Sequence, residues 1–434
     1  MGKDFFTVDK VESIKLGNNL KVFTSQMPHM QSVSIVIGIK AGSIYETKQE
    51  QGISHFIEHM LFKGTENKKD TLAISQAIEQ LGGEINASTS EECTFLYSKV
   101  LHNNFEAAFE VCTDILNNSL FRKEDIGQEK NVVLEEINKY QDIPEDWITF
   151  LINRLMWKDS VLGQNVLGEK RTVQSFTRQS ITKYFQERYQ PGNMIISITG
   201  NISPEVIPNV LNRFPILHRN NIPKILPPLK HAENAEPELK LVTKKVNQAH
   251  LCFGFEGISR LHPDKFVLDL LNIILGGGLG SRLFQQVRVK EGLAYDIHSY
   301  LQYFNEAGSF NIYAGVVADK LIHSVEKILQ ELRKIKEIGV TGTELKIAKE
   351  IYKGSVLMGL ENTMSYAFRL GSYALLYDKE YNFQEIIGRV EKVQAEDVSR
   401  VANNIFQTPK IKLAVFSPDD LKIKKSKLLP ILAI

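Results

Sequence analysis

The chain has 434 residues, of which 43% are apolar and 24% are charged, and its formal net charge is +1. This length exceeds one ordinary core, so we expect two or more domains, and the near-neutral charge argues against a uniformly basic nucleic-acid-binding protein. No run of about eighteen apolar residues is present, which argues against a membrane-spanning helix and a membrane partner. The N-terminus has neither a signal-peptide core nor the composition of a transit peptide. Cys93, Cys112 and Cys252 are odd in number and widely spaced, so we interpret them as buried thiols in a reducing compartment.

The net charge conceals an asymmetry along the chain. Residues 1–214 carry 22 basic and 27 acidic side chains, and the remainder carries 30 basic and 24 acidic ones. Between Glu50 and Asp146 there are 8 basic and 19 acidic residues. Such an acidic region attracts basic peptides, although a solvated acidic surface is the alternative interpretation.

The first half predicts alternating strands and helices. Alternation over 32–40 indicates a half-buried strand, and a helix is expected over 50–64. Asp70 or Thr71 caps a second helix, which ends at Gly82 and Gly83. The remaining elements follow in chain order: strands near 84–90 and 92–101, a helical stretch from 104 to about 189, and a strand over 194–200.

The helix over 50–64 carries His55, Glu58 and His59. At about 100° per residue these side chains share one side of the helix, and its apolar residues occupy the other. Histidines four residues apart can chelate one metal ion, and Glu58 could take a proton from a metal-bound water. The order His-x-x-Glu-His matches the inverzincin motif. Two solvated histidines remain the alternative at this point.

A third metal ligand is available in the helical stretch downstream. Glu129 and Glu136 are seven residues apart, close to two turns, so both point to the same side. A catalytic zinc site takes three protein ligands and leaves the fourth position for water. Glu135 is the neighbouring candidate.

With these residues the sequence resembles the pitrilysin family of zinc metallopeptidases, in particular its shorter members similar to the mitochondrial processing peptidase. In that family 76 residues separate the second histidine from the third ligand, a glutamate, and 76 residues lie between His59 and Glu136. The resemblance therefore implies one Zn²⁺ per chain, held by His55, His59 and Glu136, with Glu58 as the base. Glu129 matches the family's supporting acidic residue, which orients a ligand.

The middle of the chain predicts a linker. Five of the 14 prolines fall within 215–237, which suggests an inter-domain linker between a zinc-binding domain 1–214 and a homologous domain 238–434. The second half repeats the order of the first: a strand over 250–255, a helix over 262–275, strands near 293–302 and 308–316, helices from 318 to about 404, and a strand over 412–416. We expect an α+β fold in which each domain is a mostly antiparallel sheet packed against helices. The resemblance implies that the two domains face each other like a clam shell.

The second half contains a glycine-rich segment from Gly276 to Gly280. It lacks both the ending of a phosphate-binding loop and the spacing of a dinucleotide fingerprint. It resembles the glycine-rich loop of the pitrilysin family, which is followed by an arginine and a tyrosine seven residues apart, and Arg288 and Tyr295 match this pair. The resemblance implies that these two hold the substrate and stabilise the oxyanion, with Gly277 and Gly278 as substrate contacts. A surface arginine and a core tyrosine are the alternative.

The expected strand near 84–90 has small polar side chains. A peptide can add to such an exposed sheet edge through backbone hydrogen bonds. The segment resembles the family's Gly-Gly-x-x-Asn-Ala-x-Thr edge strand, which implies that Asn86, Ala87 and Thr89 bind substrate. An ordinary edge strand is the alternative.

Together these patterns and the resemblance imply a zinc endopeptidase that cleaves unfolded or extended peptides, with a preference for basic ones, inside a closed chamber. Short members of the family commonly pair, so the resemblance implies a dimer, and a homodimer is sufficient because one chain carries both the metal motif and the glycine-rich segment. The expected compartment is a bacterial cytoplasm, or the mitochondrial matrix if an import segment precedes Met1. Two alternatives remain: a non-catalytic structural relative of the same fold, and a catalytic subunit that needs a different partner chain.

Overall fold

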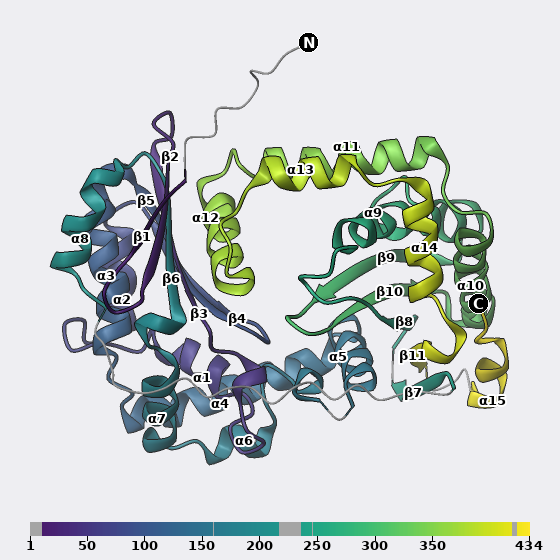
Figure 1. Ribbon diagram of the computed structural model, residues 1–434. Coiled ribbons are helices and arrows are strands. Elements are labelled where there is room, and N and C mark those ends of the chain that lie inside the picture. The colour runs from purple at the N-terminus through teal and green to yellow at the C-terminus, as the bar shows by residue number, and fades with distance from the viewer. Residues whose placement is uncertain (1–10, 159, 217–235, 245, 419–422) are drawn as a thin grey trace, which may run out of the picture. The chain divides into compact units, whose positions relative to one another are not determined.

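Figure 1 shows the computed structural model, which describes residues 11–158, 160–216, 236–244, 246–418 and 423–434. Most of the expected linker 215–237 lies outside these residues. The chain forms two compact units, and neither is continuous in sequence. The first unit comprises Met1–Ile137, Gln164–Pro227 and Leu357–Tyr381, and the second comprises Asn138–Gly163, Pro228–Val356 and Asn382–Ile434.

The first unit is built on a six-stranded sheet with the order β1-β2-β6-β3-β5-β4. Its strands are β1 (Glu12–Lys15), β2 (Lys21–Gln26), β3 (Ser32–Ile39), β4 (Glu84–Thr89), β5 (Thr94–Leu101) and β6 (Met194–Gly200). Strands β2 and β6 pair in parallel, and the other neighbours pair antiparallel. Strands β1 and β2 were not predicted from the sequence.

The second unit contains a five-stranded sheet with the order β7-β11-β8-β10-β9. Its strands are β7 (Glu238–Lys244), β8 (Ala249–Glu256), β9 (Ala294–Tyr303), β10 (Gly308–Val316) and β11 (Lys412–Pro418). Here too one pair, β7 with β11, is parallel and the rest are antiparallel. The order therefore repeats β2-β6-β3-β5-β4 of the first sheet. This repetition confirms the expected α+β fold with two related, mostly antiparallel sheets.

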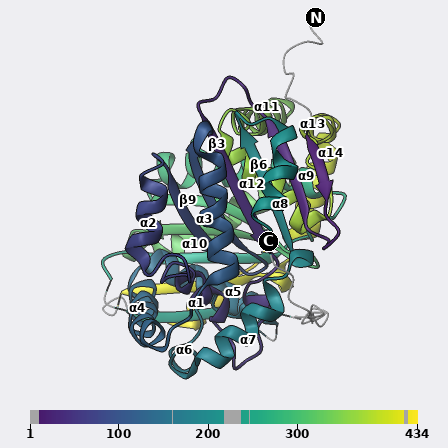
Figure 2. The same ribbon diagram turned by 90° about the vertical axis from the view of Figure 1, so that its left-hand side faces the viewer.

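Helices pack on one face of the first sheet, and the larger of the two apolar cores at this sheet lies between them and the strands. These helices are α1 (Ile53–Met60), α2 (Thr71–Glu79), α3 (Phe105–Asn118), α7 (Arg178–Arg188) and α8 (Ile207–Arg213). Figure 2 shows α2, α3 and α8 in front of this face. Because side chains alternate along a strand, Ile35 and Ile37 of β3 join this core, while Val36 belongs to the smaller core on the opposite face.

The opposite face of each sheet is covered by a helix from the other half of the sequence. Helix α12 (Thr363–Ser372) packs on β3 and β6 of the first sheet, and α5 (Pro144–Met156) packs on β8 and β11 of the second. Ala367 and Ile148 are fully buried in these contacts. The two halves of the sequence therefore exchange one helix each.

Long helices precede the exchanged ones. Helix α4 (Lys123–Asp142) leads to α5, which Pro144 starts at its first turn, and α11 (Gly342–Met358) leads to α12. Within the described residues, the expected helical stretch 104–189 is divided into the α-helices α3 to α7, and α1 is shorter than the expected 50–64. The remaining α-helices are α6 (Lys170–Ser175), α9 (Lys265–Gly276), α10 (Leu321–Glu337), α13 (Phe383–Glu391), α14 (Ala395–Ile405) and α15 (Lys425–Leu428). Within the described residues, no helix combines the length and apolar character needed to cross a bilayer.

Candidate metal centre

Helix α1 presents His55, Glu58 and His59 from the first unit. Its apolar residues, including Ile53 and Phe56, are fully buried against the sheet. The helix begins after Gly52, whose φ of 90° lies in the left-handed region that favours glycine. A Cβ atom there would also lie 2.6 Å from the carbonyl oxygen of Leu167. The sequence can therefore start α1 only with glycine at this position.

The structure brings three donor atoms together between α1 and α4. The Nε2 atoms of His55 and His59 are 3.2 Å apart, and Oε2 of Glu136 lies 3.6 Å and 3.5 Å from them. Among the described residues, these three form a cluster of potential metal ligands, with one donor atom from each lying within 4.8 Å of the others. Glu135 is not part of it.

The geometry of these donors fits a zinc ion. With ligand bonds of about 2.0–2.1 Å, neighbouring donors of a tetrahedral site lie about 3.3–3.4 Å apart. The three separations bracket that value and form a nearly equilateral triangle. Within the described part of the chain, Oε2 of Glu136 is a buried oxygen with no hydrogen-bond donor. A cation between the three atoms would satisfy this oxygen.

Glu129 supports the triangle from α4, one heptad before Glu136. Its Oε1 lies 2.7 Å from Nδ1 of His59, which leaves Nε2 of that ring facing the other two donors. Lys63 forms an ion pair with the other oxygen of Glu129. Burial would raise the pKa of Glu129, but the bonds from His59 and Lys63 outweigh it and hold the pKa below its usual value. The carboxylate is therefore ionised and fixes the orientation of the His59 ring.

The two histidines differ in proton affinity. Burial, reinforced by the neighbouring His59, lowers the pKa of His55 to about 3. Burial also acts to lower the pKa of His59, but the hydrogen bond and charge of Glu129 reverse the direction and raise it. A neutral His55 ring offers a lone pair without first losing a proton.

Glu58 stands beside the triangle with its own pKa raised by burial. A hydrogen bond from Thr89 acts in the opposite direction. The Thr89 hydroxyl also lies 3.2 Å from the hydroxyl of Thr94, whose own proton is donated to the carbonyl of Ala41 at 2.9 Å. A carboxylate whose pKa is raised by burial is a stronger base than an ordinary glutamate, and the Thr89 hydroxyl positions it.

The N-terminal end of α1 is held by the buried carboxylate of Glu46. Its two oxygens accept the backbone N–H groups of Gly52 at 2.7 Å and Ser54 at 2.9 Å. Burial raises the pKa of Glu46 to about 7, and these two bonds act in the opposite direction. The hydroxyls of Ser54 and Tyr184 are 2.7 Å apart.

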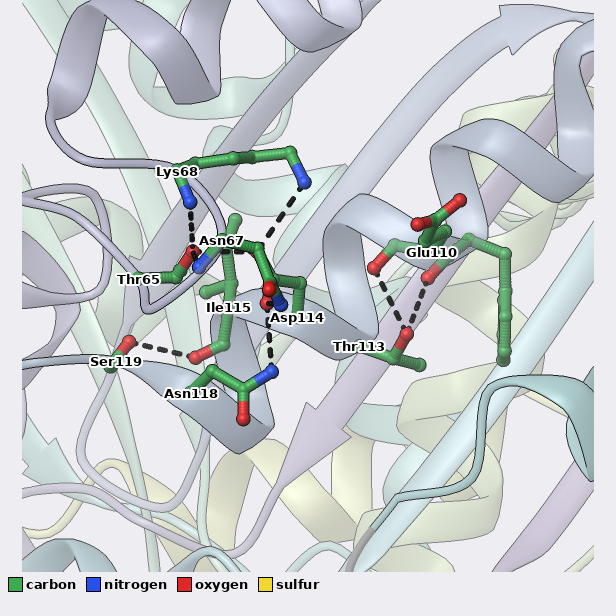
Figure 3. A network of polar contacts seen from close by, with 10 residues as sticks. Thr65, Asn67, Lys68, Glu110, Thr113, Asp114, Ile115, Asn118 and Ser119 are labelled. Carbon is green, nitrogen blue, oxygen red and sulfur yellow. Dashed lines mark hydrogen bonds and ion pairs between the residues drawn. The ribbon is translucent and has the colours of Figure 1, made fainter.

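The segment that follows α1 is anchored to α3 by Asp114, as Figure 3 shows. Asp114 accepts from Thr65 and from Asn67 at 2.6 Å each, and Lys68 lies 3.3 Å from it. Burial would raise the pKa of Asp114, but these partners and Asn118 lower it. The ionised carboxylate thus fixes the segment that presents Lys63 to Glu129.

The predicted residues of the second half lie in the second unit. Arg288 is in a π-helical segment, η6 (Phe284–Lys290), and Tyr295 follows at the start of β9. The guanidinium carbon of Arg288 is 5.5 Å from the centre of the Tyr295 ring, and this ring is 74% exposed. The structure therefore brings these two together and leaves the tyrosine accessible, unlike the core tyrosine of the alternative interpretation.

The two glycines of the predicted loop differ in their surroundings. A Cβ atom at Gly277 would lie 2.6 Å from Cα of Ile273, so packing at the end of α9 requires glycine there. A Cβ atom at Gly278 would meet nothing within 4 Å. Packing within the unit therefore gives no reason for glycine at Gly278.

The residues Asn86, Ala87 and Thr89 lie on β4, at the edge of the first sheet. Strand β4 pairs with β5 on one side. Asn86 is exposed, Ala87 is buried and Thr89 is partly buried. The expected edge strand is thus present, and its Thr89 side chain is turned toward Glu58.

Comparison with known proteins identifies the family. A profile described as "Insulinase (Peptidase family M16)" matches residues 21–170, and one described as "Peptidase M16 inactive domain" matches residues 175–352. An uncharacterized zinc protease of Bacillus subtilis is 37% identical over 403 residues, which cover 92% of this chain and 97% of that protein. The chain belongs to peptidase family M16. This assignment confirms the resemblance to the pitrilysin family.

Other relatives extend the same likeness. An uncharacterized zinc protease of Rickettsia felis is 34% identical over 410 residues, which cover 94% of this chain and 98% of that protein. The crystal structure of a protease from Helicobacter pylori covers 95% of this chain and all of its own, with a TM-score of 0.89 and 23% identity. A Pseudomonas fluorescens structure described as a peptidase M16 inactive domain has a TM-score of 0.86 and 20% identity over 94% of this chain and 98% of its own. The M16 chain thus shares its fold with solved structures across nearly its whole length.

Sequence reasoning missed the residues that hold α1 in place. Glu46, Lys63 and Asp114 lie outside the His-x-x-Glu-His motif, and no short pattern marks them. One signal was present: Gly52, which precedes the helix, has no side chain to cap it. A capping carboxylate from elsewhere in the chain could have been sought on that ground.

Proposed function

We propose that this M16 protein is a zinc-dependent endopeptidase that cleaves unfolded or extended peptides. The triangle of His55, His59 and Glu136 donors, with Glu58 beside it, carries this proposal. These three residues would hold one zinc ion. When bound, zinc supplies a Lewis acid that acidifies water and polarises a carbonyl group.

The residues around the triangle divide the work of hydrolysis. Glu58 accepts a proton from the attacking water and returns it to the leaving amine. Thr89 positions the Glu58 carboxylate through its hydroxyl. Glu129 fixes the His59 ring in the tautomer whose Nε2 faces the site. The other residues proposed for the site bind and position the substrate.

For substrate binding we propose β4 as a docking edge, with Asn86 and Ala87 pairing to the peptide backbone. Arg288 and Tyr295 would contribute donors to the oxyanion, and Gly278 would give the peptide close access to the backbone. We further propose that a zinc-binding domain and a homologous domain, joined around 215–237, enclose the peptide. The protein would act as a homodimer, and its compartment would be the cytoplasm. The open space at Gly278 and the exposed ring of Tyr295 support the substrate-binding roles proposed for these two residues.

Metal analysis of the purified protein, combined with a peptidase assay with and without a chelator, tests the proposal. Replacing His55, His59 or Glu136 by Ala should abolish zinc binding and cleavage together. Glu58→Gln should keep zinc and lose turnover by about two to four powers of ten, because the donors survive while the base does not. Wild-type cleavage rates in Glu58→Gln would contradict this mechanism.

The assay also separates the alternatives. Absence of zinc and of cleavage would favour a non-catalytic relative of the same fold. Zinc binding without cleavage by the protein alone would favour a catalytic subunit that requires a different partner chain.

A further inference from the structure

His55 lies in the first turn of α1, so the position of this proposed ligand depends on whether that turn stays helical. His55 is the third residue of the eight-residue helix Ile53–Met60. The first backbone N–H groups of any helix have no partner within the helix, so the first turn frays before the rest. In α1 that turn carries a metal ligand.

The usual remedy, a side chain at the residue before the helix, is absent from α1. That residue is Gly52, which provides no capping side chain. The orphan N–H of Ser54 instead donates to Oε1 of Glu46, eight residues earlier, and the N–H of Gly52 donates to Oε2. Glu46 is only 4% exposed, so water does not compete for these bonds.

Further contacts show that this end of α1 is built for a fixed position. The Thr172 hydroxyl donates to the carbonyl of Gln51 at 2.7 Å, and Ser54 and Tyr184 share a hydrogen bond. The carboxylate of Glu46 also faces the positive end of the helix dipole. Two backbone N–H bonds to one carboxyl group define the direction in which α1 leaves the preceding loop.

We propose that Glu46 is a positioning residue for the metal centre, which holds the first turn of α1 so that His55 meets His59 and Glu136 in the donor triangle. This inference rests on the proposed zinc site. It assigns to Glu46 a role in how tightly the metal is held, not a contact with substrate or metal.

The matched control is Asp70, which caps the next helix of the same unit. Its side chain accepts the N–H of Ala73 at 2.9 Å at the start of α2, a helix that carries none of the proposed ligands. Asp70→Ala and Glu46→Ala both remove a carboxylate from a helix N-terminus. Only the second should affect the metal.

The experiment measures the zinc dissociation constant by competition with a chromogenic chelator, for the full chain and each variant. Glu46→Ala should raise the Kd about ten- to a hundredfold, as losses of supporting groups around metal ligands do. Glu46→Gln should raise it less, because its amide keeps one acceptor for one of the two N–H groups. Asp70→Ala should leave the Kd within about twofold of wild type.

Amide hydrogen exchange on the zinc-free wild-type and variant proteins gives a second reading that needs no metal. The Ser54 N–H should be protected in the wild type and should exchange faster in the Glu46 variants. Exchange of Ser54 at the rate of an open amide in the wild type would overturn the inference without using any variant.

Two zinc results would also overturn it: wild-type affinity in both Glu46 variants, or an equal loss in Asp70→Ala. If Glu46→Ala does not fold, the milder Glu46→Gln decides by the same criterion. Failure of the wild type to bind zinc would refute the proposed function, while the exchange rates would still report whether Glu46 holds α1.

Discussion

Burial shifts the proton affinities of neighbouring side chains at the candidate centre in opposite directions. It lowers the pKa of His55 and raises that of Glu58, while Glu129 overrides burial to raise the pKa of His59. A neutral imidazole and a basic carboxylate are the two states that a metal ligand and a general base require. The same desolvated surroundings therefore favour both proposed roles.

Arg288 and Tyr295 permit a test of single residues in the second unit. Arg288→Ala and Tyr295→Phe should each lower kcat on a peptide by about one to three powers of ten, because each removes a proposed donor to the developing oxyanion. Zinc content should stay unchanged. Lys290→Ala, an exposed cation in the same π-helical segment, is the control and should retain wild-type kcat.

Full kcat in both variants would assign this pair a structural role. A raised KM with unchanged kcat would instead indicate that the two side chains bind substrate and transition state equally.

At the scale of elements, Arg282 ties the glycine-rich segment to the first turn of α11. Its Nε and Nη2 lie 2.7 Å and 2.9 Å from the two oxygens of Glu344. The bonds from Arg282, followed by those from Thr341, outweigh burial and lower the pKa of Glu344 to about 2. Because the folded pKa is depressed, the pair stabilises the protein above the unfolded value of 4.5 and loses that contribution as pH falls toward 2.

Glu344→Gln should therefore lower the free energy of unfolding by about 1–2 kcal/mol at pH 6. Linkage allows up to about 3 kcal/mol, and solvent reduces it because the Glu344 side chain is 30% exposed. Denaturant titrations at pH 6 and pH 3 should show the difference between wild type and variant shrinking at the lower pH. Glu350→Gln, at an exposed ion pair with Lys353, is the control, and a pH-independent difference for Glu344→Gln would contradict the linkage.

Helix α12 offers a test of the exchanged packing. Ala367 is fully buried against the first sheet, and the Ser197 hydroxyl donates to its carbonyl at 2.6 Å. Ala367→Glu would bury an unpaired charge there and should cost about 3–5 kcal/mol of folding free energy. Ser365→Glu, on the exposed side of the same helix, should change stability by less than about 0.5 kcal/mol. Thermal unfolding followed by circular dichroism measures both, and equal melting temperatures would refute the packing described for α12.

The elements differ in how well sequence predicted them. The strong alternation of β3 and β6 and the two faces of α1 were evident because burial on one side leaves a period in the sequence. Strands β1, β2 and β7 were missed; β1 and β2 have no clear period. The exchange of α5 and α12 was missed for another reason. An apolar face indicates that a helix is buried on that side, but it does not indicate on which sheet the helix packs.

At the candidate centre, the two histidines followed from helical spacing, whereas Glu136 needed the family spacing to separate it from Glu135. Glu46 could not be found from residue spacing, since its partners are backbone N–H groups, which every residue except proline has. The sequence signal was Gly52, which indicates that a cap must come from elsewhere but not which residue supplies it.

At the scale of the whole molecule, the acidic region between Glu50 and Asp146 leads to a prediction about substrates. Peptides rich in Arg or Lys should be captured faster than acidic peptides of equal length, and the difference should shrink as salt screens the charges. The measurement is kcat/KM for one basic and one acidic peptide at low and high ionic strength. Equal values at low salt would remove the electrostatic proposal, and efficient digestion of a stable folded protein would argue against an enclosing chamber.

The exchanged helices also affect how the protein can be made. The hydroxyls of Ser34 and Thr363 are 2.8 Å apart, although 329 positions separate them in the chain. At about 5–20 residues per second, a ribosome needs roughly 15–65 seconds to travel from one to the other. Val36, Phe95 and Ile195 are synthesised in the course of that interval, before the helix that covers them. The nascent first sheet therefore has an uncovered apolar face, which is prone to aggregation, until translation is nearly complete. Helix α5, in contrast, is synthesised before the strands of the second sheet on which it packs.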